Sequence, residues 1–249
     1  MSERVVLVTG AATGVGAAVC RRLATPGVAL LIHTRSNATG LAAVAGEARA
    51  KGAMVAEMLG DLADPAVAAA LVAGAVETFG GLDVVVSNAG FADRTPVAAL
   101  TDAVFEASFQ AMQGGFLRLA RAALPHLHAG REARLIAVSS FVAHAFRPGF
   151  PVFPASAAAK AGLEALVRAL AVECAPTLTV NAVAPGFVRK DSGTHAAISA
   201  VGMEERVNWI PMGRVGLPDY IAAAIAFLAS PDAGYITGQV LHVDGGLVI

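Results

Sequence analysis

Short apolar runs alternate with longer, partly polar segments along the whole chain. The runs predict strands at 4–9, 28–34, 53–59, 82–87, 135–138, 178–184 and 239–243. The segments between them predict helices at 17–25, 40–51, 65–79, 101–129, 156–173, 194–208 and 218–229. Each strand is a near-continuous apolar run, which is typical of strands buried on both faces of a parallel sheet. We therefore expect one α/β domain over residues 1–249, with a seven-stranded parallel sheet covered by helices on both faces.

Composition narrows the class of protein. Hydrophobic residues make up 56% and charged residues 15%, so a large core is easily built and buried subunit surface is expected as well. The 18 basic residues nearly balance the 19 acidic ones, which argues against a nucleic-acid or membrane-surface partner. No signal peptide and no membrane-length apolar run is found, so we expect a cytoplasmic protein. Cys20 and Cys174 lack metal-site spacing, and we expect them to be buried apolar residues.

A glycine loop follows the first predicted strand and opens the first helix. It reads Thr9-Gly-Ala-Ala-Thr-Gly-Val-Gly16. Glycines at such a junction let the backbone turn tightly and approach a pyrophosphate, which then lies at the helix N-terminus. The strand–loop–helix context predicts a dinucleotide-binding site rather than an ordinary turn.

The stretch from Arg134 to Glu173 carries the candidate chemistry. A buried strand delivers Ser139 and Ser140 to its carboxyl end, and a helix then presents Ser156 and Lys160 four residues apart. In an open α/β sheet, ligands bind outside the carboxyl ends of the strands. The stretch contains no tyrosine, since the tyrosines of the chain are Tyr220 and Tyr235.

Five motifs in order make the chain resemble the short-chain dehydrogenase/reductase family, in particular the 3-oxoacyl-carrier-protein reductases. After the glycine loop come Asp61-Leu62, Ser87-Asn-Ala-Gly90, Asn181-Ala-Val-Ala-Pro-Gly-Phe-Val188, and the pair Thr237-Gly-Gln239 and Val243-Asp-Gly-Gly246. The resemblance implies a single-domain Rossmann fold and an oxidoreductase acting on a small-molecule substrate. It implies that the nicotinamide cofactor is held by Gly10, Thr13, Gly14, Val15, Gly16, Asp61, Leu62, Asn88, Ala89, Gly90, Lys160, Pro185, Gly186 and Val188.

The end of the second strand indicates which nicotinamide cofactor binds. An acidic residue there would accept hydrogen bonds from a ribose 2′-hydroxyl and favour NAD. The segment reads His33-Thr-Arg-Ser-Asn37, without an acid. Arg35 and Ser36 can hold a 2′-phosphate, because a guanidinium suits that anion, so the sequence favours NADP(H) over NAD(H). Position 13, often basic in NADP-using relatives, is threonine here.

The family's usual catalytic residues are asparagine, serine, tyrosine and lysine. The resemblance places Lys160 and Ser140 at the lysine and serine positions, Ser156 at the tyrosine position and Met112 at the asparagine position. The loop between Ser140 and Ser156 is longer than is usual in the family. A rival alignment puts Phe153 at the tyrosine position, but it would leave Ala157 at the lysine position, so we reject it.

The missing tyrosine leaves three routes for the proton, because a serine hydroxyl is a far weaker acid than a phenol of pKa about 10. Ser140 and Ser156 can hydrogen-bond the substrate while water supplies the proton. Alternatively, His144 in the longer loop can act as the acid, since histidine titrates near neutral pH. The third route is an activated carbonyl, imine or conjugated alkene that needs little acid assistance.

Two other functions compete with an oxidoreductase of this atypical kind. One is a catalytically silent nucleotide-binding or regulatory member of the same fold, for which the replacements at Met112 and Ser156 argue. The other is a normal reductase whose tyrosine was exchanged for serine, which the second replacement and the longer loop disfavour. The resemblance also implies association through the helices after the fourth and fifth strands, and hence a homotetramer, or a homodimer.

Overall fold

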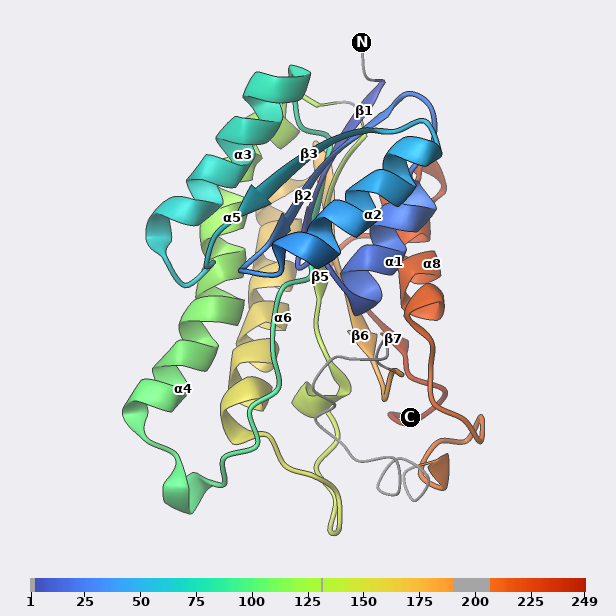
Figure 1. Cartoon of the computed structure of the whole chain (residues 1–249). Helices are drawn as coiled ribbons and strands as arrows, with labels where there is room; N and C mark the ends of the chain where they lie inside the picture. Colours follow the sequence, from blue (N-terminus) through green and yellow to red (C-terminus); the bar gives the residue numbers. More distant parts are fainter. Residues whose placement is uncertain (1–2, 131, 190–206) are drawn as a thin grey trace.

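The computed structural model describes residues 3–130, 132–189 and 207–249. Its centre is a seven-stranded parallel sheet with strand order β3-β2-β1-β4-β5-β6-β7 (Figure 1). The strands are β1 (Arg4–Thr9), β2 (Val28–Thr34), β3 (Met54–Leu59), β4 (Val84–Ser87), β5 (Ala133–Val138), β6 (Leu178–Pro185) and β7 (Val240–Val243). The predicted fold class, a single α/β domain with an all-parallel sheet, is confirmed.

Helices cover both faces of the sheet (Figure 1). One face packs against α3 (Pro65–Phe79), α5 (Gly115–Leu127) and α6 (Pro154–Cys174), through buried residues such as Leu71, Phe116 and Leu163. The other packs against α1 (Gly14–Leu23), α2 (Ala38–Ala50) and α8 (Pro218–Ala229), through Val19, Leu41 and Ile225. The near-continuous apolar strands are explained by these two layers, since both faces of each central strand are buried.

Local sequence signals fix several of the helix ends. Asp64 caps α3 by accepting a hydrogen bond from Ala66 N at 2.9 Å, Pro65 follows in the first turn, and Gly80 ends the helix with φ +87°. Asn37 caps α2 in the same way, accepting from Gly40 N at 3.0 Å. Because Asn37 directly follows Arg35 and Ser36, this cap fixes the direction in which the chain leaves the end of β2.

The long helix predicted at 101–129 is interrupted. It consists of α4 (Asp102–Phe109), a π-helical turn η2 (Gln110–Gly114) and α5. Such π turns concentrate at functional sites, because the extra residue re-aims the side chains around it. Here the turn carries Met112, which is 2% exposed. The helix predicted at 194–208 falls almost entirely outside the described residues.

The sheet has its switch point between β1 and β4, where the order of the strands reverses. The connections that follow β1 and β4 leave to opposite faces, which opens a crevice at the carboxyl edge of the sheet. Short 3-10 turns η1 (Val97–Ala99) and η3 (Phe141–Ala143) follow β4 and β5 at this edge, and η4 (Pro231–Ala233) precedes β7. No helix in the described part of the chain is long and apolar enough to cross a membrane.

Candidate functional site

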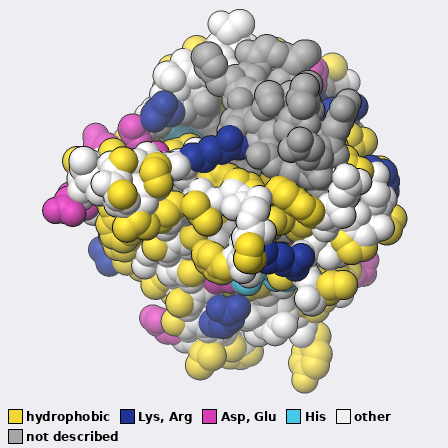
Figure 2. Space-filling view, turned by 90° about the horizontal axis from the view of Figure 1, so that it is seen from below, with side chains coloured by type: hydrophobic (Ala, Val, Ile, Leu, Met, Phe, Trp, Pro, Cys, Tyr) yellow, Lys and Arg dark blue, Asp and Glu magenta, His cyan; other side chains and the backbone are white. Residues whose placement is uncertain are grey.

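A cavity of about 740 Å³ opens at the carboxyl edge of the sheet. Figure 2 views the molecule from this side, where apolar side chains gather around a few cationic ones. The lining comes from the glycine loop, the ends of β2, β3 and β4, the π turn, the segment after β6 and the first residue of α8. Its residues are Gly10, Ala12, Thr13, Gly14, Val15, His33, Thr34, Arg35, Ser36, Asn37, Gly60, Asp61, Leu62, Asn88, Ala89, Gly90, Phe91, Ala111, Val188, Arg189 and Pro218. We call it the dinucleotide cavity.

The glycine loop is held in shape from the neighbouring strand. Asn88, after β4, donates through Nδ2 to Thr9 O at 2.9 Å and to Gly10 O at 3.0 Å. In return, Thr9 Oγ1 accepts from the backbone nitrogens of Asn88 and Ala89 at 3.0 and 3.1 Å. A Cβ atom at Gly16 would lie 2.2 Å from Gly10 O, so this glycine is required by close packing under the loop. The loop is therefore a rigid, backbone-lined concavity.

The end of β2 presents a cation to the cavity. The Arg35 side chain is 71% exposed, and its NH1 atom lies 4.0 Å from Asp61 Oδ2. Asp61 is itself oriented by Ala63 N, which donates to Oδ1 at 2.9 Å. Because an exposed pair at this distance holds its partners weakly, the Arg35 guanidinium is available to an anion.

His33 is a cavity residue that sequence reasoning did not single out. Its Nε2 atom donates to Gly60 O at 2.9 Å, and burial is the main cause that lowers the pKa of the ring. Its Nδ1 atom is buried, with no partner among the described residues. The neutral ring thus offers an acceptor under the wall of the cavity. The sequence signal that could have pointed to His33 is a polar side chain inside an otherwise apolar strand.

Lys160 does not line the cavity as described, but it lies next to the cavity residue Gly90. It is 7% exposed, and its Nζ atom donates to Val138 O at 2.6 Å. Burial lowers the pKa of this lysine to about 8, and the nearby Glu164 carboxylate acts in the opposite direction. A Cβ atom at Gly90 would lie 3.3 Å from Lys160 Nζ and 3.5 Å from the Met112 side chain. Lys160 and Met112 are therefore neighbours behind the cavity residue Gly90.

Ser140 and Ser156 are placed differently. Ser140 caps the turn η3, its Oγ accepting from Val142 N at 3.4 Å, and a hydroxyl that accepts can still donate its hydrogen. Ser156 is 2% exposed; its Oγ accepts from Asp93 N at 2.9 Å and lies 3.5 Å from Phe91 O. Ser156 thus fastens the segment after β4 to the first turn of α6.

His144 does not line the dinucleotide cavity as described. Its Nε2 atom lies 2.8 Å from Glu164 Oε1 on α6, and its ring packs edge-on against His242 of β7, with centroids 4.5 Å apart. Glu164 and His242 both contact His144, and the motifs of the sequence analysis did not single out either residue.

Aromatic side chains fill the space beside the cavity that the long loop encloses. Phe141 contacts Phe150, Phe153 and Phe187, at centroid distances of 5.9, 6.4 and 4.5 Å. Trp209 packs on Phe150 at 4.6 Å, and the Arg94 guanidinium lies 5.4 Å from the Phe153 ring centre. This aromatic cluster gives the region an apolar wall.

Two of the predicted cofactor residues lie at the end of β6 and do not line the cavity as described. Pro185 ends the strand, and a Cβ atom at Gly186 would lie 2.8 Å from Asp244 Cα, so the glycine allows close packing on the chain after β7. Val188, two residues on, lines the cavity and pairs with Gly216. Lys190, Asp191 and Ser192 lie outside the described residues.

Among the described residues, no group of three histidine, cysteine, aspartate or glutamate side chains could hold a metal ion.

Known proteins resemble this chain over almost its whole length. The family described as Enoyl-(Acyl carrier protein) reductase matches residues 10–248. An uncharacterised oxidoreductase of Methylorubrum extorquens is 36% identical, over 99% of this chain and 98% of its own. Two further relatives are each 34% identical to this chain. One is versicolorin reductase of Emericella nidulans, matched over 99% of this chain and 96% of its own length. The other is 3-oxoacyl-[acyl-carrier-protein] reductase of Staphylococcus aureus, matched over 97% of this chain and 96% of its own length.

Solved structures agree with these relatives. A short-chain dehydrogenase of Burkholderia cenocepacia in complex with NADP superposes with a TM-score of 0.90 at 30% identity. That match covers 99% of this chain and 98% of the other. A Serratia marcescens short-chain dehydrogenase/reductase variant gives the same score and identity, over 100% and 99% of the two chains.

Proposed function

The chain belongs to the short-chain dehydrogenase/reductase family, and we propose that it is an NADP(H)-dependent oxidoreductase with an atypical set of acid/base residues. The observation that carries the proposal is the placement of Lys160 next to Gly90, a residue of the cavity that the glycine loop and Arg35 also line. A dinucleotide-binding surface and a titratable ammonium group thus meet at one place.

The residues present fit a nicotinamide dinucleotide. The cavity volume lies within the range of about 300–1,000 Å³ usual for ligand sites. The glycine loop offers backbone to a pyrophosphate at the N-terminus of α1, and the donors of Lys160 that Val138 O does not take suit hydroxyl groups. When bound, the cofactor supplies or accepts a hydride. The chain's own part is to orient the cofactor and to hold or move a proton beside the reacting atoms.

We infer a preference for NADP(H) from the end of β2. Arg35 is exposed at the cavity wall, Ser36 follows it, and no acidic residue stands in His33–Asn37 to accept hydrogen bonds from a free ribose 2′-hydroxyl. The guanidinium can pair with a 2′-phosphate through two parallel hydrogen bonds. The relative crystallised with NADP supports the same choice.

The proton transfer is the unusual part. We assign Ser156 to the position where the family has tyrosine and Met112 to that of its asparagine. The Ser156 hydroxyl is bound to the segment after β4, and a thioether carries no hydrogen to donate, so neither replacement supplies a strong acid. His144 is bonded to Glu164. Of the three routes, this geometry favours an activated carbonyl, imine or conjugated alkene, oriented by Ser140 with Lys160 nearby.

A binding titration tests the cofactor assignment. NADPH fluorescence should change on addition of protein and saturate, with a Kd in the micromolar range, and NADH should bind at least tenfold more weakly, as the loss of one charge-assisted interaction implies. Absence of NADPH binding would overturn the proposed function. Tighter binding of NADH would overturn the cofactor preference alone.

A catalytically silent regulatory protein is the alternative that Met112 and Ser156 favour. The two functions differ in one observable. An oxidoreductase turns over an activated substrate and loses that turnover in Ser140→Ala or Lys160→Ala. A regulatory protein binds NADPH without oxidising it across the same panel of carbonyls, imines and conjugated alkenes.

We also propose that the protein is a homotetramer that associates through the helices after β4 and β5. The exposed apolar residues Phe105 and Phe109 of α4, 42% and 39% exposed, support this assignment. A mass measurement at micromolar concentration should give four chains. A mass of one chain would contradict it.

A further inference from the structure

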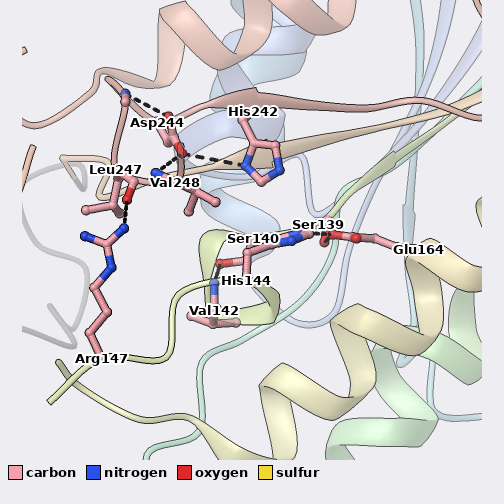
Figure 3. Close-up of polar contacts among 11 residues, drawn as sticks. Ser139, Ser140, Val142, His144, Arg147, Glu164, His242, Asp244, Leu247 and Val248 are labelled. Atoms are coloured by element: carbon pink, nitrogen blue, oxygen red, sulfur yellow. Dashed lines mark hydrogen bonds and ion pairs between the residues drawn. The ribbon is translucent and has the colours of Figure 1, made fainter. Parts of the chain in front are cut away.

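A buried carboxylate lies between the predicted catalytic residues and the end of the chain. Glu164 of α6 is 2% exposed. Figure 3 shows it facing Ser139 at the end of β5, with His144 beside that pair and His242 and Asp244 beyond. We call Ser139, His144, Glu164, His242 and Asp244 the Glu164 cluster.

The contacts of Glu164 compensate for its burial. A buried charge is tolerated when it is paired and hydrogen-bonded. Its Oε1 atom accepts from the Ser139 hydroxyl and lies 2.8 Å from His144 Nε2, while Oε2 lies 3.7 Å from the Arg168 guanidinium. Three separate parts of the chain, namely β5, the loop after η3 and α6, therefore meet at one carboxylate.

Each of these parts carries a predicted catalytic residue. Ser139 immediately precedes Ser140, and Lys160 lies four residues before Glu164, on the same side of α6. The loop that holds His144 leads into the aromatic cluster. A change at Glu164 would therefore alter the relative positions of Ser140 and Lys160, although Glu164 does not line the dinucleotide cavity.

The cluster extends to the segment after β7. His144 packs on His242, whose Nδ1 atom lies 3.6 Å from Asp244 Oδ2, an ion pair when His242 is protonated and too long for a hydrogen bond. Asp244 in turn accepts from Gly246 N and Val248 N at 2.9 and 3.0 Å. Arg147, in the same loop as His144, donates to Leu247 O at 2.9 Å. The loop is thus tied to α6 on one side and to the chain end on the other.

We propose that Glu164 is a positioning residue, whose carboxylate holds the Ser140 end of β5 and the His144 loop against the helix that carries Lys160. The inference deepens the proposed function and rests on it. Glu164 has a second effect: its charge opposes the effect of burial on the Lys160 pKa, which is about 8. The ionisable groups around it are Lys160 and Arg168 on α6, His144 on the loop, and His242 and Asp244 at β7.

The test uses the small number of lysines in the chain, which are Lys51, Lys160 and Lys190. Protein labelled with ¹³Cε-lysine gives three side-chain NMR signals, and Lys160→Arg identifies the one to follow. Its titration midpoint should be near pH 8 in the parent protein. In Glu164→Gln, which keeps the shape and the bond from Ser139, the midpoint should fall by about one unit.

Glu173→Gln is the matched control, because Glu173 is exposed on the same helix. Its midpoint should equal that of the parent protein. A Glu164→Gln midpoint that also equals the parent's would contradict the charge effect. A merely structural role for Glu164 would leave the midpoint of a folded variant unchanged, so this readout separates the two.

A second variant tests the anchoring separately. His144→Phe keeps the Glu164 charge and removes the bond from the loop, so the Lys160 midpoint should stay and amide exchange in residues 141–153 should accelerate at least tenfold. Unchanged exchange in that segment would overturn the anchoring. Both measurements are made without cofactor or substrate. Failure to bind NADPH would therefore refute the proposed function, and the titration and exchange results would test the Glu164 inference.

Discussion

The glycine-loop side of the carboxyl edge and the α6 side differ in what they leave open. On the first side, backbone, Arg35 and Asp61 surround the cavity of about 740 Å³. On the second side, the aromatic cluster packs upon itself, Ser156 is bound to the segment after β4, and Glu164 is buried among its partners. A polar, preformed surface suits a large charged cofactor, whereas the other side offers an apolar, closely packed wall.

This difference indicates which half of the site is generic and which is particular to this chain. The five motifs that resemble the family lie mostly on the cofactor side. The proposed replacements at Met112 and Ser156 and the longer loop lie on the other. The cofactor side should therefore tolerate little change, while changes on the α6 side should alter rate and pH dependence more than cofactor affinity.

The largest effect should come from filling the space under the glycine loop. Gly16→Val adds a side chain whose Cβ would lie 2.2 Å from Gly10 O, so the loop must move and NADPH affinity should fall more than 100-fold. Gly46→Ala is the control, because nothing lies within 4 Å of its added Cβ in α2. That control should keep NADPH affinity and gain up to about 1 kcal/mol of unfolding free energy. Equal affinities in the two variants, by fluorescence titration, would refute the close-packing argument.

Removing the buried ammonium should change the pH dependence of stability on the α6 side. The pKa of Lys160 is lowered to about 8 from 10.5, so between these values the unfolded chain binds more protons than the folded one. The unfolding free energy therefore rises with pH through this window, by about 3 kcal/mol for this group. Lys160→Met should lose that rise and, below pH 8, be more stable than the parent protein.

Urea unfolding at pH 7, 8, 9 and 10 measures the unfolding free energy of the parent protein and of Lys160→Met. Lys51→Met serves as the control, since Lys51 is exposed and its curve should follow the parent's. Parallel curves for the parent protein and Lys160→Met would mean that Lys160 is not a depressed titrating group in the folded protein.

The fold could be predicted from the sequence because its strands and helices follow local patterns, and the described cavity lies at the predicted glycine loop. Apolar runs give the strands, and a glycine loop between a strand and a helix gives the cavity. The Glu164 cluster was not predicted, because its members come from the end of β5, the loop between β5 and α6, α6 itself, and the end of β7. In addition, a polar residue within a helix resembles a solvated one in sequence. The π turn at Met112 was missed because it preserves helical periodicity on both sides.

A smaller effect is expected at the end of β2. Arg35→Ser removes the cation proposed to hold a 2′-phosphate, so NADPH should bind about 10- to 100-fold more weakly while NADH affinity stays the same. Arg49→Ser is the control, because Arg49 pairs with Glu57 at 3.0 Å and does not line the cavity as described. A parallel loss of NADPH and NADH affinity in Arg35→Ser would assign the residue a structural role instead.

The smallest effect concerns Ser156. Ser156→Ala removes the acceptor for Asp93 N, which should cost about 1 kcal/mol of unfolding free energy and leave NADPH affinity unchanged. Turnover of an activated substrate should fall by less than tenfold, as expected for a residue that anchors a segment. A loss of turnover above 100-fold would instead mark Ser156 as the proton donor.

The central claim is that an intact cofactor side works beside an altered acid/base side, and single-turnover oxidation of NADPH tests it most directly. Protein in excess is mixed with NADPH and either 9,10-phenanthrenequinone, an activated dicarbonyl, or cyclohexanone, a simple ketone. The NADPH absorbance at 340 nm should be lost with the quinone, at a rate at least 100-fold above that with the ketone. Equal rates with both substrates, or no oxidation with either, would contradict it.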